Sequence, residues 1–460
     1  MHSGVALLSS LFAFLIPVTI GAYWPVYSIS QNAAIILLRP SILAASLLLA
    51  LVWYHAPATS AELQAVAVLG LLSAALLVPS LTATDPARAL AVWVKLVILC
   101  VISLLLSRAL RHQATAKSFG VALILAGLCV GAFTVLTYVH FMGFVMPTYK
   151  LTREFKGIAE RTGIPLNAIP FTSVFSFLAG MCLVRANWLL WLLGFALFVI
   201  SSAFTGSRAP LLVLLLSALA LGLLNAFQSR RLPIRVMAYI MACMVPIGIA
   251  VLIFHTPFKR MSSLTEGRWD LWYVAVTKFA ERPVLGFGYA SWRDDLASML
   301  PGAYSLTSYM AKSIVGGYHN EYLSLLAEQG LVGFVPAMLL VCFLFSSCWK
   351  SAFRTWRTRP SGQWILFACI FLLLRAGVEI PGLFGDGSEP ADFLAYIFVA
   401  IVISRFSIEE DFLKANTSYS WGRTAAQFTS GSAEQNTKPA GSARRPQGSD
   451  VPVGLDRSYV

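Results

Sequence analysis

Charged residues are scarce in this chain of 460 residues. Asp, Glu, Lys and Arg make up 12% of it, against roughly 25% in an ordinary soluble domain. Hydrophobic residues make up 58%, and the mean hydropathy is +0.73. A water-soluble globule of this length could not cover its surface with so few polar groups. The same figures exclude a disordered chain, a coiled coil and a disulfide scaffold, and they leave a polytopic membrane protein.

The motifs of several common chemistries are also missing. The chain has no P-loop and no His-x-x-x-His pair, so an ATPase and a zinc enzyme lack support. Its seven cysteines form no cluster and fall in or beside apolar segments, where they read as small apolar residues. The pair Asp294–Asp295 could bind a divalent ion, but a solvated acidic pair is the simpler interpretation. We therefore expect neither a metal site nor a cofactor.

Apolar runs of about 20 residues recur along the chain, which is the length of a membrane-spanning helix. The runs do not alternate in polarity as the strands of a β-barrel would, so we predict helices. The first run lacks a basic leader and a cleavage site, and we interpret it as a retained helix. The expected fold is all-α, with about twelve transmembrane helices at 5–23, 34–53, 63–82, 89–107, 119–140, 168–184, 187–204, 209–227, 236–254, 331–349, 363–381 and 391–406.

The net charge of +13 is unevenly distributed, and its pattern indicates membrane topology rather than nucleic-acid binding. The connections after the fourth, sixth, eighth and tenth runs hold eleven basic residues and no acidic one. The positive-inside rule makes that side cytoplasmic, together with both termini. The basic residues are Arg108, Arg111, Lys117, Arg185, Arg230, Arg231, Arg235, Lys350, Arg354, Arg357 and Arg359.

Two long loops, 141–167 and 255–330, then face the opposite side, which in a bacterium is the periplasm of the inner membrane. The longer loop carries Trp, Tyr, His, Arg and Asp and is where chemistry is expected, although it could also be a structural lid. The predicted membrane domain covers 1–406. The segment 407–460 is rich in Ser, Gly, Ala and Pro and is predicted to be a disordered cytoplasmic tail.

Four charged residues fall inside apolar runs, where a charge near the helix centre costs roughly 2.5–3.5 kcal/mol. At about 1.5 Å per residue, Arg39, Lys95 and Arg375 lie roughly 7–9 Å below the outer surface. Glu379 follows Arg375 by four positions, so these two can pair. Arg39 and Lys95 could simply extend to the interface. The functional interpretation is a cationic cavity that suits an anionic lipid headgroup such as a diphosphate.

Two further motifs present arginines at the outer surface. Thr205–Gly206–Ser207–Arg208 permits a tight turn, and the planar guanidinium of Arg208 matches phosphate oxygens. The segment from Gly267 to Pro283 has aromatic and apolar residues at helical spacing, so it is predicted to be an amphipathic helix that lies on the membrane or caps the bundle. Arg268 falls in its first turn, where only a bound anion would favour a cation. An interfacial anchor and simple packing are the structural alternatives.

The third motif is Tyr318–His319–Asn320–Glu321–Tyr322, from which a helix is predicted to run to Gly330. The positive end of the helix dipole beside His319 would keep its imidazole neutral, as a general base requires. A lone histidine is more often a capping or packing residue. Its position in a long outer loop that also carries arginines favours the functional interpretation.

Taken in order, Gly206–Ser207–Arg208, the stretch from Arg268 to Gly288, and the stretch from His319 to Gly333 resemble the signature of the bacterial O-antigen ligase superfamily. The resemblance covers roughly residues 200–345. It implies a membrane glycosyltransferase that moves a polysaccharide from undecaprenyl diphosphate to lipid A–core oligosaccharide, at the periplasmic face and without a metal. O-antigen polymerases and protein O-oligosaccharyltransferases share the superfamily. The arginines tested for the Arg-x10-Gly pattern of some polymerases do not show it, and no periplasmic domain for a protein acceptor is visible, so ligation in lipopolysaccharide biosynthesis is favoured.

The mechanism we expect has Arg208 and Arg268 neutralising the donor diphosphate while His319 accepts the proton of the acceptor hydroxyl, with inversion at the anomeric carbon. The expected partners are the undecaprenyl diphosphate-linked donor, the lipid A–core acceptor and membrane lipids, with no nucleic acid. A flippase for lipid-linked oligosaccharides is the alternative that is not an enzyme. The expected substrate-binding residues are Arg39, Lys95, Arg375, Asn320 and Tyr322.

Overall fold

The computed structural model describes residues 58–145, 151, 154–155, 168–184, 188–205, 208–228, 268–289, 291, 318–354, 361–378, 383–384 and 392–410. Within these residues all regular secondary structure is helical, as predicted, and no strand occurs. The helices are α4 (Ser60–Leu81), α5 (Pro86–Ala109), α6 (Gln113–Met142), α8 (Ala168–Met181), α9 (Trp188–Thr205), α10 (Arg208–Gln228), α12 (Arg268–Glu281), α15 (Glu321–Arg354), α16 (Ser361–Ala376) and a helix over 392–410.

Every predicted apolar run that falls within the described residues forms a helix. Three runs, 5–23, 34–53 and 236–254, lie outside the described residues. By length and composition, α4, α5, α6 and the Glu321–Phe353 part of α15 can each cross a membrane. The predicted amphipathic helix is α12, which ends at Glu281, two residues before Pro283.

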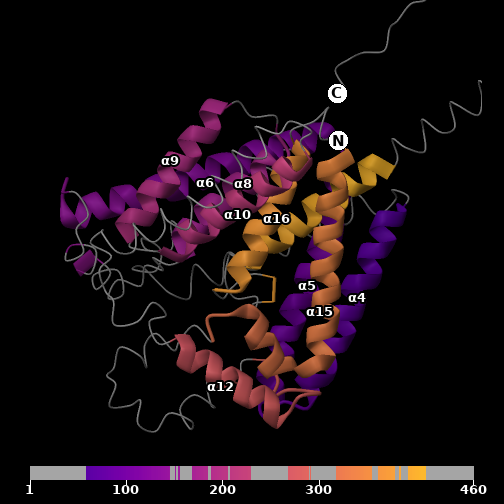
Figure 1. Ribbon diagram of the computed structural model, residues 1–460. Helices are drawn as coiled ribbons and strands as arrows, with labels where there is room; N and C mark the ends of the chain where they lie inside the picture. Colours follow the sequence, from indigo (N-terminus) through magenta and orange to yellow (C-terminus); the bar gives the residue numbers. More distant parts are fainter. Residues whose placement is uncertain are drawn as a thin grey trace, which may run out of the picture.

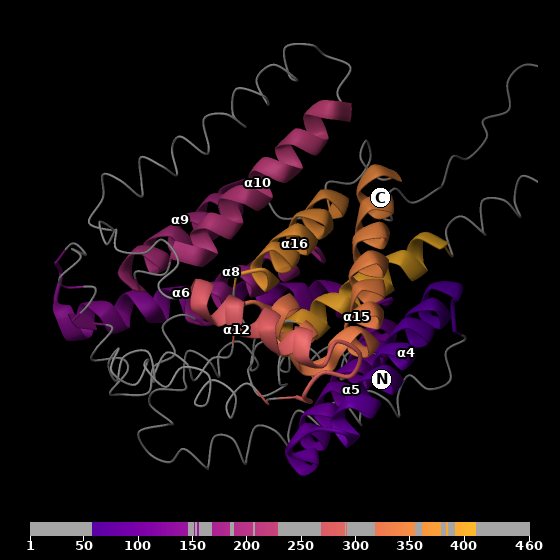
Figure 2. The same ribbon diagram turned by 60° about the horizontal axis from the view of Figure 1, so that its bottom comes forward.

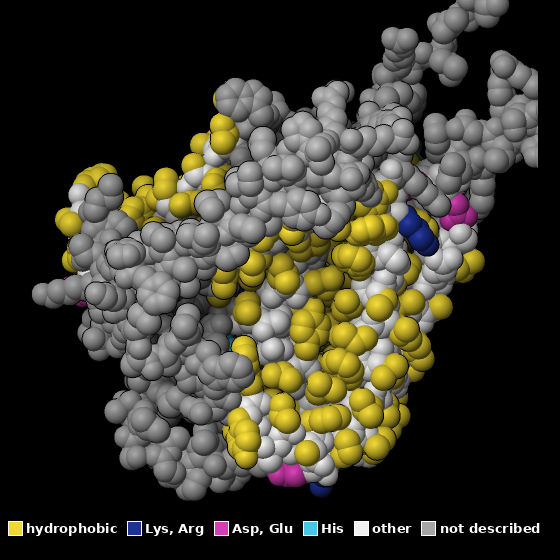
Figure 3. Space-filling model, viewed as in Figure 1, with side chains coloured by type: hydrophobic (Ala, Val, Ile, Leu, Met, Phe, Trp, Pro, Cys, Tyr) yellow, Lys and Arg dark blue, Asp and Glu magenta, His cyan; other side chains and the backbone are white. Residues whose placement is uncertain are grey.

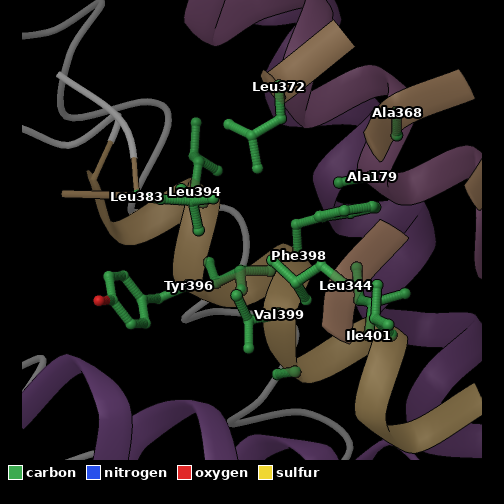
Figure 4. Packing of buried hydrophobic residues seen from close by; sticks show 14 of the residues in the cluster. Ala179, Leu344, Ala368, Leu372, Leu383, Leu394, Tyr396, Phe398, Val399 and Ile401 are labelled. Carbon is green, nitrogen blue, oxygen red and sulfur yellow. The ribbon is translucent and has the colours of Figure 1, made fainter. Parts of the chain in front are cut away.

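The centre of the bundle is the helix over 392–410. All residues from Leu394 to Ile403 are buried, so this helix is enclosed on every side. Figure 4 shows its side chains packed among Ala179 of α8, Leu344 of α15 and Leu372 of α16. The helix also runs beyond residue 406, where the tail was predicted to start, and the residues after 410 lie outside the described part.

Three long helices, α4, α5 and α15, run side by side along one flank of the bundle (Figures 1 and 2). On the face over α4 and α15, hydrophobic side chains form a broad band, and the few charged side chains visible there lie at the two ends (Figure 3). Such a band is the surface that a protein turns toward acyl chains. The structure and the composition together describe a membrane protein.

One end of the bundle, which we call the basic end, gathers the start of α4 and the ends of α5 and α8. The buried carboxylate of Glu62 pairs with Arg108 Nε at 3.3 Å and Arg111 Nη1 at 3.4 Å. Arg405 donates to the main-chain oxygen of Cys182 at 2.8 Å, just after α8. Two of the basic residues that define the predicted cytoplasmic side thus serve to join helices.

Candidate active site

The opposite end of the bundle, which we call the motif end, is organised by a break in α15. Gly330 has φ 57° and ψ −163°, a backbone conformation open almost only to glycine. The break frees two amides from the helical pattern. Leu331 N–H donates to Pro283 O at 2.8 Å, and Val332 N–H donates to Val284 O at 3.1 Å. The predicted end of a helix at Gly330 is therefore confirmed, and a second helical segment follows at once.

The same break frees two carbonyls, which the loop after α12 also satisfies. Phe287 N–H donates to Ala327 O at 3.3 Å, and Gly288 N–H donates to Glu328 O at 2.6 Å. In an unbroken helix these carbonyls would accept from Leu331 and Val332. Two helical hydrogen bonds are therefore exchanged for four between segments, and every freed group keeps a partner.

We call this set of four main-chain hydrogen bonds the interlock. The interlock requires a glycine in each of the two segments that it joins, Gly330 in α15 and Gly286 in the loop after α12. Gly286 also has a positive φ, of 65°, and a Cβ there would collide with Glu328 O. Below it, Leu271 and Val274 of α12 share a buried cluster with Tyr318. The interlock and this cluster join α12, its following loop and the first part of α15 into one unit.

Side chains of the third motif cap the end of α16. The Nδ2 of Asn320 donates to Gly377 O at 2.9 Å, and the hydroxyl of Tyr322 donates to Leu373 O at 3.0 Å. The last carbonyls of a helix have no partner within it, so these bonds supply what α16 lacks. The Oδ1 of Asn320 also accepts from Leu323 N–H at 3.0 Å, which makes Asn320 the N-cap of α15.

Glu321 makes a third hydrogen bond between the start of α15 and the region of α16. Its buried carboxylate accepts from Phe384 N–H at 2.7 Å, so α15 is tied to the segment that follows α16. Asn320, Glu321 and Tyr322 thus each contact a different main-chain group in or after α16. Three consecutive residues fix the start of α15 on this neighbour.

His319 precedes these three residues and has φ 50°. In the described part of the chain it is the one residue other than glycine with a positive φ. Such a conformation costs on the order of 1–3 kcal/mol and persists only where the surroundings impose it. Its side chain is half-buried, whereas the neighbouring Tyr318 is completely buried. The structure therefore holds the backbone of His319 strained while leaving its imidazole partly accessible.

Residues 190–338 match the protein family described as O-Antigen ligase. The match covers about a third of the chain and supports membership of the O-antigen ligase superfamily. No curated protein matches the chain. Members of this superfamily are membrane enzymes of the glycosyltransferase kind, and this confirms the family predicted from the motifs.

The segment that matches the O-antigen ligase family contains the interlock and all three predicted catalytic residues. Arg208 is the first residue of α10, and Arg268 is the first residue of α12; the side chains of both lie outside the described part. Phe204, four residues before Arg208, stacks on Tyr138 near the end of α6, with ring centroids 4.4 Å apart. This contact joins the end of α9, just before α10, to the last part of α6.

The predicted substrate-binding cations fall outside the segment that matches the O-antigen ligase family. Arg375 is buried, and its guanidinium lies 3.4 Å from the ring centroid of Phe171 in α8. It lies on the side of α16 opposite Leu373 and Gly377, which face α15. Lys95 is half-buried on α5. Arg39, and Glu379 with which Arg375 was expected to pair, lie outside the described residues.

Sequence reasoning missed a group of buried polar side chains at the motif end. Tyr289 is buried, and its burial raises the pKa of its phenol well above the usual range, with further contributions from the charges of Glu328, Glu321 and Asp392. The sequence signal that could have indicated this group is the position of Glu321, Glu328 and Asp392 at the borders of apolar runs. In the described residues, no three His, Cys, Asp or Glu side chains are arranged to hold a metal.

Proposed function

We propose that this chain transfers a polysaccharide from an undecaprenyl diphosphate carrier to lipid A–core oligosaccharide at the periplasmic face of the inner membrane. One observation carries the proposal: the matched segment, 190–338, contains two arginines that begin helices and a strained, partly accessible histidine. These are the groups that transfer from a diphosphate donor needs.

Arg208 and Arg268 hold the donor diphosphate in this mechanism. The start of a helix presents free N–H groups and the positive end of the dipole, and therefore attracts anions. An arginine at that position adds a planar pair of donors for phosphate oxygens. Negative charge grows on the diphosphate as the bond to the sugar breaks, so the same contacts are strongest in the transition state.

His319 acts as the general base. The acceptor hydroxyl oxygen attacks the anomeric carbon, a new C–O bond forms, and the bond between sugar and diphosphate breaks with its electron pair going to the diphosphate oxygen. The imidazole takes the hydroxyl proton and later releases it to water. In-line attack inverts the anomeric centre. The diphosphate is a good leaving group, so ATP is not required.

The remaining predicted ligands have supporting roles in this proposal. Asn320 and Tyr322 can contact the substrate because each keeps capacity beyond its bond to α16: a second amide hydrogen and a hydroxyl lone pair. Arg39 and Lys95 would add positive charge for the diphosphate. Arg375, buried against Phe171, would contribute charge rather than a direct contact.

The test is an assay in liposomes with the full chain, donor lipid and lipid A–core acceptor, in which glycosylated acceptor is measured. Replacing His319, Arg208 or Arg268 with Ala should abolish transfer while the protein still elutes as a folded species. The control is Arg88→Ala, which removes a half-buried arginine from the first turn of α5. Transfer at the normal rate by His319→Ala would remove the general base from the mechanism. Product that stays on the carrier would identify a polymerase, and transport without any covalent product a flippase.

A further inference from the structure

Helix α12 has two different faces, and the packing of the bundle accounts for only one of them. Leu271, Val274 and Ala275 are buried in the cluster with Tyr318. On the other face, Tyr273 is 73% exposed and Val276 is 52% exposed. A large aromatic ring and a branched aliphatic side chain on one exposed face are unfavourable in water. The outward face therefore carries apolar surface that the described bundle does not cover.

We propose that the outward face of α12 lies in the membrane, at the boundary between lipid headgroups and acyl chains at the motif end. The occupant is the phospholipid of that leaflet. The proposal concerns where α12 lies and does not depend on the transfer reaction.

The outward face of α12 is continuous with the lipid-facing surface of the bundle. Val284, just after α12, is 57% exposed, and its carbonyl accepts from Val332 of α15. Next to it on α15, Leu331 and Val335 are also exposed. They begin the exposed apolar side of α15, which belongs to the band seen in Figure 3. The interlock thus joins the apolar surface of α12 to the surface that faces acyl chains.

The orientation of α12 also fits a position along the membrane surface. Helix α12 lies across the end of the bundle where α15 begins, and both views show it transverse to α4 and α15 (Figures 1 and 2). A helix transverse to membrane-spanning helices at their ends lies along the membrane surface. Tyrosine is favoured at that depth because its ring is apolar and its hydroxyl reaches water.

The described charged side chains of α12 lie away from its outward face. Lys278 is almost fully buried, with its Nζ 3.2 Å from Glu281 Oε2 and 4.7 Å from the ring centroid of Phe287. Glu281 and Arg282 are exposed only at the end of the helix. Lys278 is the one charged residue in the middle of the described part of α12, and its side chain is buried away from the outward face around Val276. A partner recognised by charge is disfavoured, and a lipid surface fits.

The experiment measures the depth of nitroxide labels in liposomes of phosphatidylethanolamine and phosphatidylglycerol. The background variant replaces Cys129 and Cys342, which are exposed thiols, and Cys243 with Ala. Labels are attached in separate proteins to Tyr273→Cys and Val276→Cys. The control label is at Glu281→Cys, whose parent side chain is exposed at the charged end of the same helix.

At both test positions, collisions of the label with oxygen should exceed collisions with a water-soluble nickel chelate, and the ratio should reverse at the control position. Two outcomes would overturn the proposal. Labels at 273 and 276 that meet the nickel chelate as often as the control label would show a water-facing helix. Low collision rates with both reagents would show that protein, from this chain or a partner, covers the face. Two test positions guard against a local effect of one substitution.

Discussion

Replacing Gly330 with Ala tests the interlock most directly. The backbone at this residue is accessible almost only to glycine, and an alanine there costs on the order of 1–3 kcal/mol. The new Cβ would also collide with Val284 O and lie 2.7 Å from Gly286 N. The loop must move away, which breaks the four main-chain hydrogen bonds, each worth about 0.5–1.5 kcal/mol. We expect a total loss of about 3–9 kcal/mol from these terms.

The chain offers a matched control at Gly143. Its backbone has nearly the same conformation, with φ 75° and ψ −176°, but nothing lies within 4 Å of an added Cβ. Gly143→Ala should therefore carry the backbone cost of about 1–3 kcal/mol alone. Gly70→Ala, inside α4 and equally open, should be neutral or stabilising by about 1 kcal/mol.

The assay is thermal unfolding of the purified protein in detergent, followed by circular dichroism, with transfer measured on each variant that remains folded. The expected order of stability is Gly70→Ala above Gly143→Ala, and Gly143→Ala well above Gly330→Ala. If Gly330→Ala unfolds at the same temperature as Gly143→Ala, the interlock contributes nothing and the reasoning is refuted.

Three further predictions concern His319, Tyr322 and Phe171. Because glycine adopts a positive φ without strain, His319→Gly should raise the free energy of unfolding by up to about 1 kcal/mol, and it should also abolish transfer. A lower unfolding temperature would show that the positive φ of His319 is not strained. Tyr322→Phe leaves Leu373 O without its donor, so the free energy of unfolding should fall by about 1–3 kcal/mol. An unchanged unfolding temperature would contradict this role. Phe171→Leu removes the ring beneath Arg375, and chemical denaturation should show a loss of about 0.5–2 kcal/mol beyond that of Phe175→Leu, whose ring has no cation over it in the described structure. Equal losses would mean that the cation–π contact adds nothing.

Most of the helices could be predicted from the sequence because lipid leaves the backbone no alternative. An apolar run such as 119–140 has one stable structure in a membrane, and α6 forms there. The order of helices in space could not be predicted in the same way. The run 391–406 has the composition of a lipid-facing helix, yet protein surrounds it, because lipid tails and leucine side chains are equally apolar.

The candidate site shows the same division. The glycines near 286 and 330 predicted a turn and a helix end, and both are present. Their pairing could not be read from the sequence, because the interlock joins main-chain groups and main-chain groups carry no residue-specific signal. Arg375 was placed at the correct end of its helix, but the sequence did not indicate which neighbour it faces, and it lies over Phe171.

The enclosed helix over 392–410 has a consequence for how the molecule is made. It follows α4 through α16 in the chain, so those helices leave the ribosome first. Until it arrives, none of the described helices from α4 to α16 fills the space between α8, α15 and α16, and whatever occupies that space must leave when it enters. Insertion of this helix would then fill a ring formed by α8, α15 and α16, and a truncation before residue 392 would leave that ring open.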